Sequence, residues 1–463
     1  MALIQIKMKK IFTFTAAKVD NRVNFLLDKG EKEKMKAKRM GQFQNQELSD
    51  HQLQKLNQLL VFVVQYNEFY KEKLKEIQLP IKSREDLLKL PFTTKAELAL
   101  DQKEYPPFGK NHSLDESQYI RYHQTSGTSG RPLKILDTEE SWEWWKTCWL
   151  EVLKSAGVTN KDRGYFAFSF GPFIGFWAAF GAAKKAGLVV IPGGSQSSKE
   201  RLHSLIENEA TVLFCTPSYA LHLAEVAEES GIDLRKTKIR KIITAGEPGG
   251  SIPSIRERIE DLWGASLFDH VGMTEMGAYG FSCSEHSGIH INENEFIAEI
   301  INPNTLQPAK KGERGELVLT NLGRYGYPLI RYRTGDLVVQ SNEACSCGNR
   351  FKFLPGGIIG RADDMVIIRG INIFPSSIES IIREFSEVKE FRIVYYTKEE
   401  MDQVKVQLEA VGEIVPALSK RLKERLGLRV EVELVETGTL PRFSMKSKRV
   451  EDKRHRSNIL LSN

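Results

Sequence analysis

The sequence predicts an α/β protein with a large N-terminal domain of mostly parallel sheets and a β-rich subdomain, followed by a small α+β C-terminal domain. Three observations lead to this prediction. Short strands alternate with helices through the middle of the chain, antiparallel-type strands follow Gly312, and helices and strands mix again from about residue 362. We therefore expect a basic N-terminal extension at 1–48, an N-terminal domain at 49–361 and a C-terminal domain at 362–463, since 463 residues exceed one compact core.

Helical patterns come first along the chain. Apolar residues at spacings of three and four run from Leu53 to about Leu74, and Ser83 is placed to cap a further helix that stops at Pro91. A longer helix, closed by Gly157, holds four of the six tryptophans. Three of them share one face, which favours core packing over a substrate box: Trp142, Trp145 and Trp149.

Strands and helices then alternate, as in a parallel sheet with helices on its faces. The predicted strands are 165–170, 187–193, 211–218 and 239–248. Predicted helices begin at Ile174 and span 218–229 and 252–262. Ligands of such sheets bind where loops leave the carboxyl ends of strands, and the sequences TPS and AGEP stand at those ends.

The last third changes character. The segments 312–323 and 327–340 have the pattern of antiparallel strands, and a mixed set of elements follows. That set comprises a helix at 375–385, strands at 391–397 and 404–411, a helix at 416–426 and a strand at 429–436.

Composition excludes several classes of protein. The chain is 41% hydrophobic and 27% charged, an ordinary profile for a globular protein. Its net charge of +6 comes from residues 1–40, with eleven Lys/Arg against four Asp/Glu, which indicates a solvated helix or tail and no nucleic-acid partner. The uncharged stretch 164–183 is broken by Gly171-Pro172, so we expect no membrane span. Five cysteines, an odd and sparse set, indicate a reducing, cytoplasmic location.

The segment HQTSGTSGRP, residues 123–132, is rich in hydroxyl groups and glycine. It lacks the Lys-Ser/Thr of a Walker-type loop, yet its donors suit phosphate oxygens. The donors are Thr125, Ser126, Gly127, Thr128, Ser129 and Gly130. Taken alone, the segment is equally compatible with a plain surface turn.

Further motifs follow in order: GEP (246–248), HVGMTEMG (270–277), RYRTGDL (331–337), GRADDMVIIRG (360–370) and PRFSMKSKRV (441–450). This ordered set resembles the adenylate-forming superfamily of acyl-CoA synthetases. YNEFYKEKL, LPFTTKAEL and RGINIFPSSIE resemble the phenylacetate–CoA ligase family in particular. The resemblance extends from about Leu53 to Arg456.

The resemblance implies a reaction in two steps with ATP, Mg²⁺ and coenzyme A. A carboxylic acid attacks the α-phosphate of Mg-ATP to give an acyl-adenylate and pyrophosphate. The coenzyme A thiol then attacks the mixed anhydride and releases AMP. The Ser/Thr/Gly loop would hold the β- and γ-phosphates, and the two domains would be an AMP-binding domain and a mobile lid.

The resemblance also assigns residues. Gly246, Glu247, Pro248, His270 and Gly272 would border the adenine. Glu275 would ligate Mg²⁺ with Thr274 beside it on the phosphate, because this hard cation prefers oxygen ligands. Asp336 would accept both ribose hydroxyls, Arg361 would lie near the ribose or phosphate, and Asp363 would be the hinge of the C-terminal domain. Ordinary turns and a solvated carboxylate are the structural alternatives at these positions.

Lys446 would be the catalytic lysine of adenylation, since a positive charge stabilises the charge that builds up between carboxylate and α-phosphate. Lys448 competes for this role, and Met445 replaces the glycine that usually precedes the lysine. A solvated basic tail is the alternative interpretation.

The acid is expected to bind to FSFGPFIGFW, where the aromatic side chains favour an aryl or arylacetic acid. The residues are Phe168, Phe170, Phe173, Phe176 and Trp177.

A second constellation is CSEH (283–286) with CSCG (345–348). Cys283, His286, Cys345 and Cys347 would bind a structural, tetrahedral zinc ion, with His290 as a substitute for His286 and free thiols as the alternative.

The sequence therefore predicts a ligase that joins a small-molecule carboxylic acid to coenzyme A. It does not decide between a monomer and a homodimer. Two other functions remain at this point. The acyl or AMP group could pass to an amine, a carrier-protein thiol or a deazaflavin cofactor, or the chain could bind nucleotide without catalysis.

Overall fold

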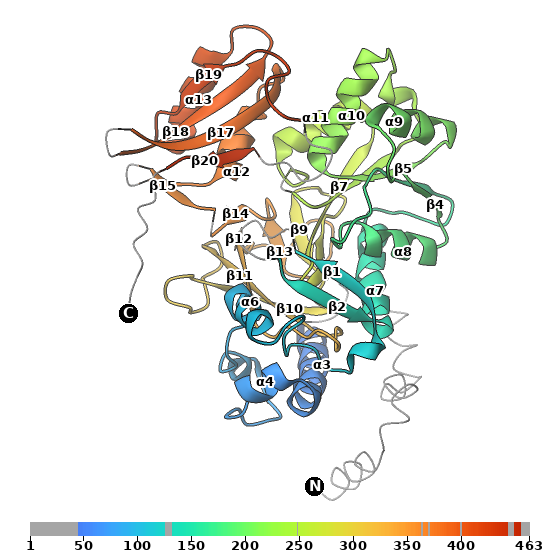
Figure 1. Ribbon diagram of the computed structural model, residues 1–463, viewed down its shortest axis with the longest axis vertical. Helices are drawn as coiled ribbons and strands as arrows, with labels where there is room; N and C mark the ends of the chain where they lie inside the picture. Colours follow the sequence, from blue (N-terminus) through green and yellow to red (C-terminus); the bar gives the residue numbers. More distant parts are fainter. Residues whose placement is uncertain are drawn as a thin grey trace, which may run out of the picture. The chain divides into compact units, whose positions relative to one another are not determined.

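The computed structural model describes residues 45–125, 132–247, 249–362, 364–368, 371–398, 401–442 and 449–454 (Figure 1). The chain divides into two units, Met1–Gln44 and Asn45–Asn463, and every described residue belongs to the second. Most of the predicted basic extension therefore lies outside the described residues. Within the described ranges, no helix combines the length and the apolar character needed to cross a membrane.

The described chain begins with four helices. They are α3 (Asn45–Tyr66), α4 (Glu68–Lys73), α5 (Arg84–Leu87) and α6 (Lys95–Glu104). The predicted single helix to Leu74 is wrong in one respect, because it breaks at Asn67. The backbone of Asn67 is extended, and its side chain caps α4 by accepting a hydrogen bond from Tyr70 N. Ser83 caps α5 as predicted.

A short 3₁₀ helix, η3 (Glu116–Gln118), leads into an antiparallel hairpin of β1 (Tyr119–Gln124) and β2 (Lys134–Thr138). The hydroxyl- and glycine-rich segment connects these two strands. Helix α7 (Glu139–Ser155) follows and packs against β8 (Gly277–Phe281). Its tryptophans are buried, which confirms core packing.

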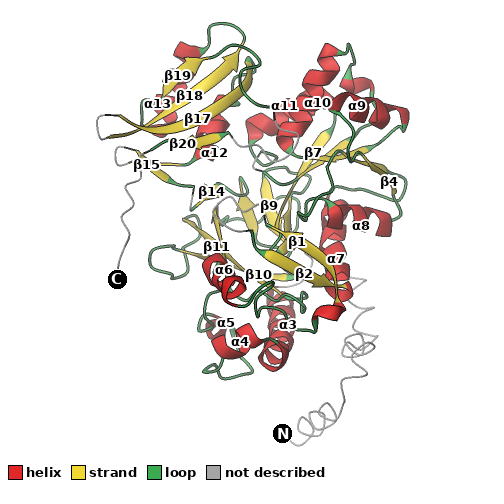
Figure 2. Cartoon of the chain, in the orientation of Figure 1, coloured by secondary structure: helices red, strands yellow, loops and turns green. Residues whose placement is uncertain are grey.

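An eight-stranded sheet lies at the centre of the fold (Figure 2). Its strand order is β13-β9-β8-β7-β6-β5-β3-β4. The strands are β3 (Arg163–Phe166), β4 (Val189–Pro192), β5 (Val212–Cys215), β6 (Lys241–Thr244), β7 (Ser266–Met273), β8, β9 (Gly288–Ile291) and β13 (Phe353–Pro355). Strands β3 to β7 are parallel, which confirms the predicted alternation, and β7, β8, β9 and β13 pair in antiparallel fashion.

Helices cover this sheet, and most of them contribute to a buried apolar core that includes Leu213, Ile242 and Trp263. They are α8 (Trp177–Lys185), α9 (Ser198–Glu207), α10 (Pro217–Glu229), η4 (Leu234–Lys236) and α11 (Pro253–Trp263). The strand predicted at 165–170 is shorter, because a tight turn from Phe168 N to Phe166 O ends it. The helix expected from Ile174 begins at Trp177, and the aromatic residues between are irregular.

A second sheet is antiparallel, as predicted, with the order β10-β11-β12-β14. Its strands are β10 (Phe296–Ile301), β11 (Arg314–Asn321), β12 (Tyr332–Val339) and β14 (Gly360–Arg361). Asp336 on β12 lies directly opposite Arg361 on β14.

The C-terminal part has its own apolar core, built from residues between Val366 and Val430. Its elements are β15 (Val366–Ile368), β16 (Ile371–Ile373), α12 (Pro375–Ile382), β17 (Val388–Lys398), β18 (Met401–Ala410), α13 (Val415–Leu426), β19 (Glu431–Leu434) and β20 (Val450–Asp452). The α+β composition matches the prediction. Strand β20 was not predicted and adds to β17 in parallel.

Candidate active site

The turn between β7 and β8 carries the predicted Thr274 and Glu275. It is tight, since Met276 N donates to Met273 O at 3.1 Å. Gly272 just before it leaves no room for a side chain, because a Cβ there would lie 2.8 Å from Gly277 O. The sequence therefore sets the turn at the carboxyl end of β7, where ligands of parallel sheets bind.

A buried arginine, Arg324, fixes this turn. Its guanidinium donates to the carbonyl oxygens of Thr274 at 2.9 Å and Glu275 at 2.8 Å. The same group makes two bonds of 2.7 Å to the carboxylate of Asp137 on β2, and both side chains are fully buried. Such a bidentate pair holds the turn in one geometry. Neither residue was predicted from the sequence.

The side chain of Glu275 is almost fully buried in this arrangement. The residue is 6% exposed, and Oε1 lies 3.5 Å from Lys95 Nζ at the start of α6. This separation is long for a hydrogen bond between charged groups. Lys95 therefore lies beside the carboxylate without a short hydrogen bond to it.

Asp336 forms the second anchor of the site. Tyr279 on β8 donates its hydroxyl to Asp336 Oδ2 at 3.1 Å, and Arg361 donates Nη1 to Oδ1 at 3.1 Å. Burial raises the pKa of Tyr279 well above its usual value, and the charges of Asp336 and Glu275 raise it further. Tyr279 therefore stays a hydrogen-bond donor, and it lies within the field of both carboxylates.

His270 on β7 is also buried. Its Nδ1 lies 2.8 Å from the carbonyl oxygen of Gly280, which can only accept, so Nδ1 carries the proton. Burial lowers the pKa of His270 to about 4, and the ring is neutral at pH 7. Its centroid lies 4.0 Å from that of Trp149 on α7.

Four of the five predicted aromatic residues form one cluster of contacting rings. Phe168 contacts Phe170 and Phe176 with ring centroids 5.8 Å and 5.4 Å apart, and Phe170 lies 4.6 Å from Trp177. Phe173 packs beside Gly171. Phe176 also contacts Trp149 at 6.1 Å, so a chain of rings connects the cluster to His270.

Gly246 and Glu247 follow the end of β6, next to the end of the parallel strand β5. Gly246 has a φ of 96°, a conformation that glycine tolerates best. Glu247 Oε1 accepts a hydrogen bond of 2.8 Å from Ser218 N at the start of α10. The two strand-end segments predicted to border a ligand are thus tied together.

Asp269 on β7 supports the same loop and was not predicted. Its carboxylate accepts bonds from Thr244 Oγ1 at 3.0 Å and Ser251 Oγ at 2.6 Å. Burial raises the pKa of Asp269 to about 6. A Cβ on Gly250 would lie 2.4 Å from this carboxylate, so the loop needs glycine there.

Thr125 closes the base of the hydroxyl-rich segment. Its N donates to Leu133 O and its Oγ1 accepts from Leu133 N, both at 3.0 Å. His123, two residues earlier, stacks on Trp142 and has Nδ1 3.9 Å from Asp137 Oδ2. Asp137 therefore contacts both the base of this segment and, through Arg324, the turn with Glu275.

Comparison with known proteins decides the family. The AMP-binding enzyme family matches residues 40–323, and the AMP-binding enzyme C-terminal domain matches 370–454. The chain belongs to the AMP-binding enzyme family. Within it, this chain is an AMP-forming acyl-CoA ligase family enzyme.

Two curated relatives of this AMP-binding enzyme are phenylacetate-coenzyme A ligases. The one from Pseudomonas putida is 31% identical over 88% of this chain and 94% of its own length. The one from Thermus thermophilus is 29% identical over 84% and 93%. A crystal structure of 2-hydroxyisobutyryl-CoA ligase with R3-HIB-AMP aligns with a TM-score of 0.84, at 29% identity over 89% of this chain and 91% of that one.

Several predicted residues of this AMP-binding enzyme lie outside the described residues. They are Ser126, Gly127, Thr128, Ser129, Gly130, Pro248, Asp363 and Lys446. Their roles stay predictions, as do the domain boundaries.

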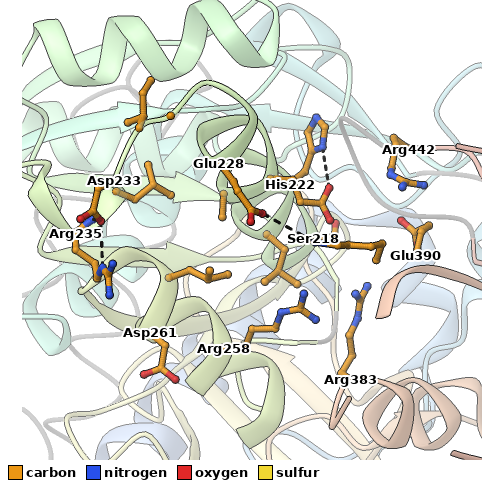
Figure 3. Close-up of a pocket in the computed structure, with 18 of the residues that line it drawn as sticks. Ser218, His222, Glu228, Asp233, Arg235, Arg258, Asp261, Arg383, Glu390 and Arg442 are labelled. Carbon is orange, nitrogen blue, oxygen red and sulfur yellow. Dashed lines mark hydrogen bonds and ion pairs between the residues drawn. The ribbon is translucent and has the colours of Figure 1, made fainter. Parts of the chain in front are cut away.

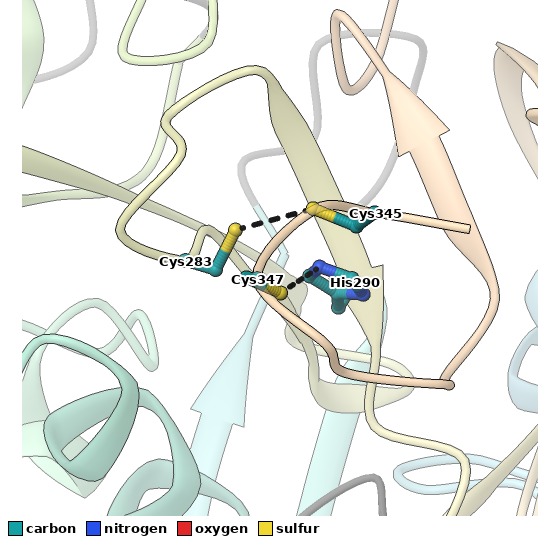
Figure 4. Close-up of side chains that lie close together, drawn as sticks. All are labelled: Cys283, His290, Cys345 and Cys347. Carbon is teal, nitrogen blue, oxygen red and sulfur yellow. Dashed lines mark hydrogen bonds between the residues drawn. The ribbon is translucent and has the colours of Figure 1, made fainter. Parts of the chain in front are cut away.

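The predicted metal ligands are brought together with one replacement. His290 lies with Cys283, Cys345 and Cys347, and His286 does not (Figure 4). His286 has a φ of 53° in a turn, and its ring packs on Phe268 with centroids 4.9 Å apart. The antiparallel pairing of β9 with β13 sets His290 opposite Phe353, close to the cysteine-bearing loop.

A cavity of about 510 Å³ lies elsewhere, between α10, α11 and residues of the C-terminal part (Figure 3). Its lining mixes both signs of charge, with Arg258, Arg383 and Arg442 facing Glu228 and Glu390. None of the described residues predicted for nucleotide or acid lines it. Arg442 and Arg449, which do line it, flank the segment that contains Lys446.

Proposed function

We propose that this enzyme is an ATP-dependent CoA ligase that activates an aryl or arylacetic acid through an acyl-adenylate. The observation that carries the proposal is the hydrogen bond between Tyr279 and Asp336 within the field of Glu275. Contacting rings lead from His270, on the strand that pairs with that of Tyr279, to the aromatic cluster. The phenylacetate-coenzyme A ligases among its relatives support the choice of acid.

Asp336 would accept hydrogen bonds from both ribose hydroxyls. Its two oxygens are already oriented by Tyr279 and Arg361, so the carboxylate would lose little freedom on binding. The neutral ring of His270 and the backbone around Gly272 would border the adenine. Neutral groups suit this task, because burying a charge against a base would cost free energy.

The donor set of the β7–β8 turn fits Mg²⁺, which binds through one or two carboxylates and substrate phosphates. Glu275 would hold the ion, and Thr274 would contact a phosphate oxygen. Bound Mg²⁺ would neutralise charge on the phosphates of ATP. The buried Arg324–Asp137 pair would keep the turn still while that charge changes.

The aromatic cluster would select the acid. Of the five predicted aromatic residues, four are half-buried and one is buried, so apolar ring surface remains for a planar acid. They are Phe168, Phe170, Phe173 and Trp177, with Phe176 buried. The 2-hydroxyisobutyryl-CoA ligase is about as similar in sequence as the phenylacetate-coenzyme A ligases. Family membership alone therefore does not determine the acid, and we assign that selection to these side chains.

The reaction would run in two balanced steps. An oxygen of the acid carboxylate bonds to the α-phosphorus of ATP as the bond to pyrophosphate breaks. The sulfur of coenzyme A then bonds to the acyl carbon, the bond to AMP breaks, and the thiol proton passes to water. Lys446 would stabilise the first step by its charge.

Product analysis tests the proposal. Purified enzyme with Mg-ATP and coenzyme A is given phenylacetate, benzoate, 2-hydroxyisobutyrate or acetate, and thioesters are identified by mass spectrometry. We expect phenylacetyl-CoA or another aryl thioester to dominate, with one AMP per thioester. Acetyl-CoA as the main product would contradict the choice of acid, and thioester formation without AMP would contradict the mechanism.

A further inference from the structure

Three of the five cysteines lie close to one histidine in the structure. All four residues are more than 100 positions beyond the aromatic cluster in the sequence. Cys283 follows β8, His290 lies on β9, and Cys345 and Cys347 lie on the loop before β13 (Figure 4). Their four ligand atoms lie within 4.8 Å of one another. Thiols and imidazole are the soft ligands that zinc prefers, and no hard carboxylate belongs to the group.

The distances match a tetrahedral metal site. Cys283 Sγ lies 3.7 Å from Cys345 Sγ, and Cys347 Sγ lies 3.4 Å from His290 Nε2. Two sulfurs at ~2.3 Å from one tetrahedral zinc are ~3.8 Å apart. A disulfide would instead need ~2.05 Å. The pair is therefore spaced to share an ion rather than a bond.

The surroundings prepare the ligands. His290 Nδ1 donates to Phe351 O at 3.3 Å, which leaves Nε2 unprotonated and turned toward Cys347. Asn349 N donates to Cys347 Sγ at 3.4 Å, a bond that stabilises a thiolate. Gly348 N closes the loop on Cys345 O at 3.1 Å. These bonds leave the lone pair of His290 Nε2 and the sulfur of Cys347 directed into the cluster, an arrangement typical of metal ligands.

Burial gives the cluster a reason to bind a cation. His290 is fully buried, and Cys283 and Cys345 are 5% and 8% exposed. Three thiols and an imidazole packed together offer little mutual hydrogen bonding, whereas a shared dication would satisfy all four. Since the protein supplies four ligands, no position is left for water or substrate, as in structural sites.

We propose that Cys283, His290, Cys345 and Cys347 bind one structural zinc ion. The ion connects the end of β8, which carries Tyr279, to the loop that leaves β12, which carries Asp336. The ion thereby stabilises the pairing of β9 with β13. It also fixes the distance between β8 and β12. This role is independent of which acid the enzyme uses.

Metal analysis of the purified full chain tests the site, with no metal-binding tag and with zinc in the growth medium. We expect about one zinc per chain in the wild type and in the matched control His286→Ala, which removes an imidazole from the loop that carries Cys283. His290→Ala should lose zinc by at least about tenfold. Metal-free wild type, or zinc retained in His290→Ala and lost in His286→Ala, would overturn the proposal.

Because His290→Ala could fail to fold, the wild type carries a second test. A mercurial that blocks thiols should release one zinc per chain, detected with a colorimetric chelator. Cobalt-substituted wild type should show the visible absorption of a tetrahedral thiolate complex. No release together with no cobalt spectrum would contradict the site even if metal had been found in the protein.

Discussion

The turn with Glu275 and the aromatic segment with Phe168 to Trp177 are held in opposite ways. Buried charges hold the turn, through Arg324 and Asp137. Ring contacts and one bond from Trp177 Nε1 to Gly171 O at 3.0 Å hold the aromatic segment. The difference teaches that the proposed nucleotide side of the site is rigid, while the proposed acid side depends on apolar shape and is expected to change without loss of the chemistry.

Breaking the charged anchor should have the largest effect. Arg324→Met leaves Asp137 buried and unpaired, so we expect the free energy of unfolding to fall by about 3–5 kcal/mol and activity to be lost. Urea unfolding and pyrophosphate release measure the two effects. The double variant Asp137→Leu/Arg324→Met should recover much of the stability but none of the activity.

Arg331→Met is the matched control, since Arg331 makes another buried pair with Glu299 at 2.8 Å. It should cost similar stability and leave the folded fraction active. If Arg324→Met were as active as this control, the turn would not need its anchor.

Removing the charge of Asp336, which is proposed to bind the ribose, should have the next largest effect. Asp336→Asn weakens hydrogen bonds to a charged group, so kcat/KM for ATP should fall about 10–150-fold, equivalent to ~1.5–3 kcal/mol. Tyr279→Phe removes only the supporting donor and should cost about 2–10-fold. A loss confined to KM for the acid would contradict the nucleotide assignment.

The pH dependence of the free energy of unfolding tests whether His270, on the rigid side of the site, is neutral in the folded protein. Burial lowers the pKa of His270 to about 4 in the folded protein. As the pH falls below ~6.5, the ring of His270 therefore takes up a proton in the unfolded chain but not in the folded one. The wild type should therefore lose about 1.4 kcal/mol of unfolding free energy per pH unit from this residue. His270→Asn should lose about 2 kcal/mol less between pH 7 and pH 5. His203→Asn, at an exposed position, should keep the wild-type slope.

Altering the apolar side should have the smallest effect. Phe170→Leu removes ring surface, so the ratio of kcat/KM for phenylacetate to that for 2-hydroxyisobutyrate should fall about 10-fold. Unfolding free energy should change little. Phe69→Leu, a half-buried ring on α4, is the control and should leave the ratio unchanged. Equal ratios in both variants would remove the aromatic cluster from acid selection.

Features that depend on neighbouring residues could be predicted from the sequence, whereas contacts between residues far apart in the chain could not. Strand–helix alternation, helix caps such as Ser83 and the ordered motifs depend on neighbouring residues, and the structure confirms the fold class that they indicate. Arg324 and Asp137 are 187 residues apart and belong to no recognised motif, so only tertiary packing reveals them. The only local signal at Arg324 is a glycine on either side, Gly323 and Gly326, and this pattern is too common to interpret.

The histidine that joins the three cysteines shows the same limit. Cys-x-x-His spacing pointed to His286, but the pairing of β9 with β13 brings His290 to the cysteines. Strand register is set by side chains from both strands, and spacing within one segment does not contain it.

Acid-dependent exchange of labelled pyrophosphate into ATP, without coenzyme A, tests the central claim most directly. We predict exchange by the wild type with an aryl acid, strong reduction in Asp336→Asn, and none in Lys446→Ala, which should still form thioester from supplied acyl-adenylate. A folded wild type that shows no exchange with any aryl acid, while Mg-ATP is present, would contradict the account.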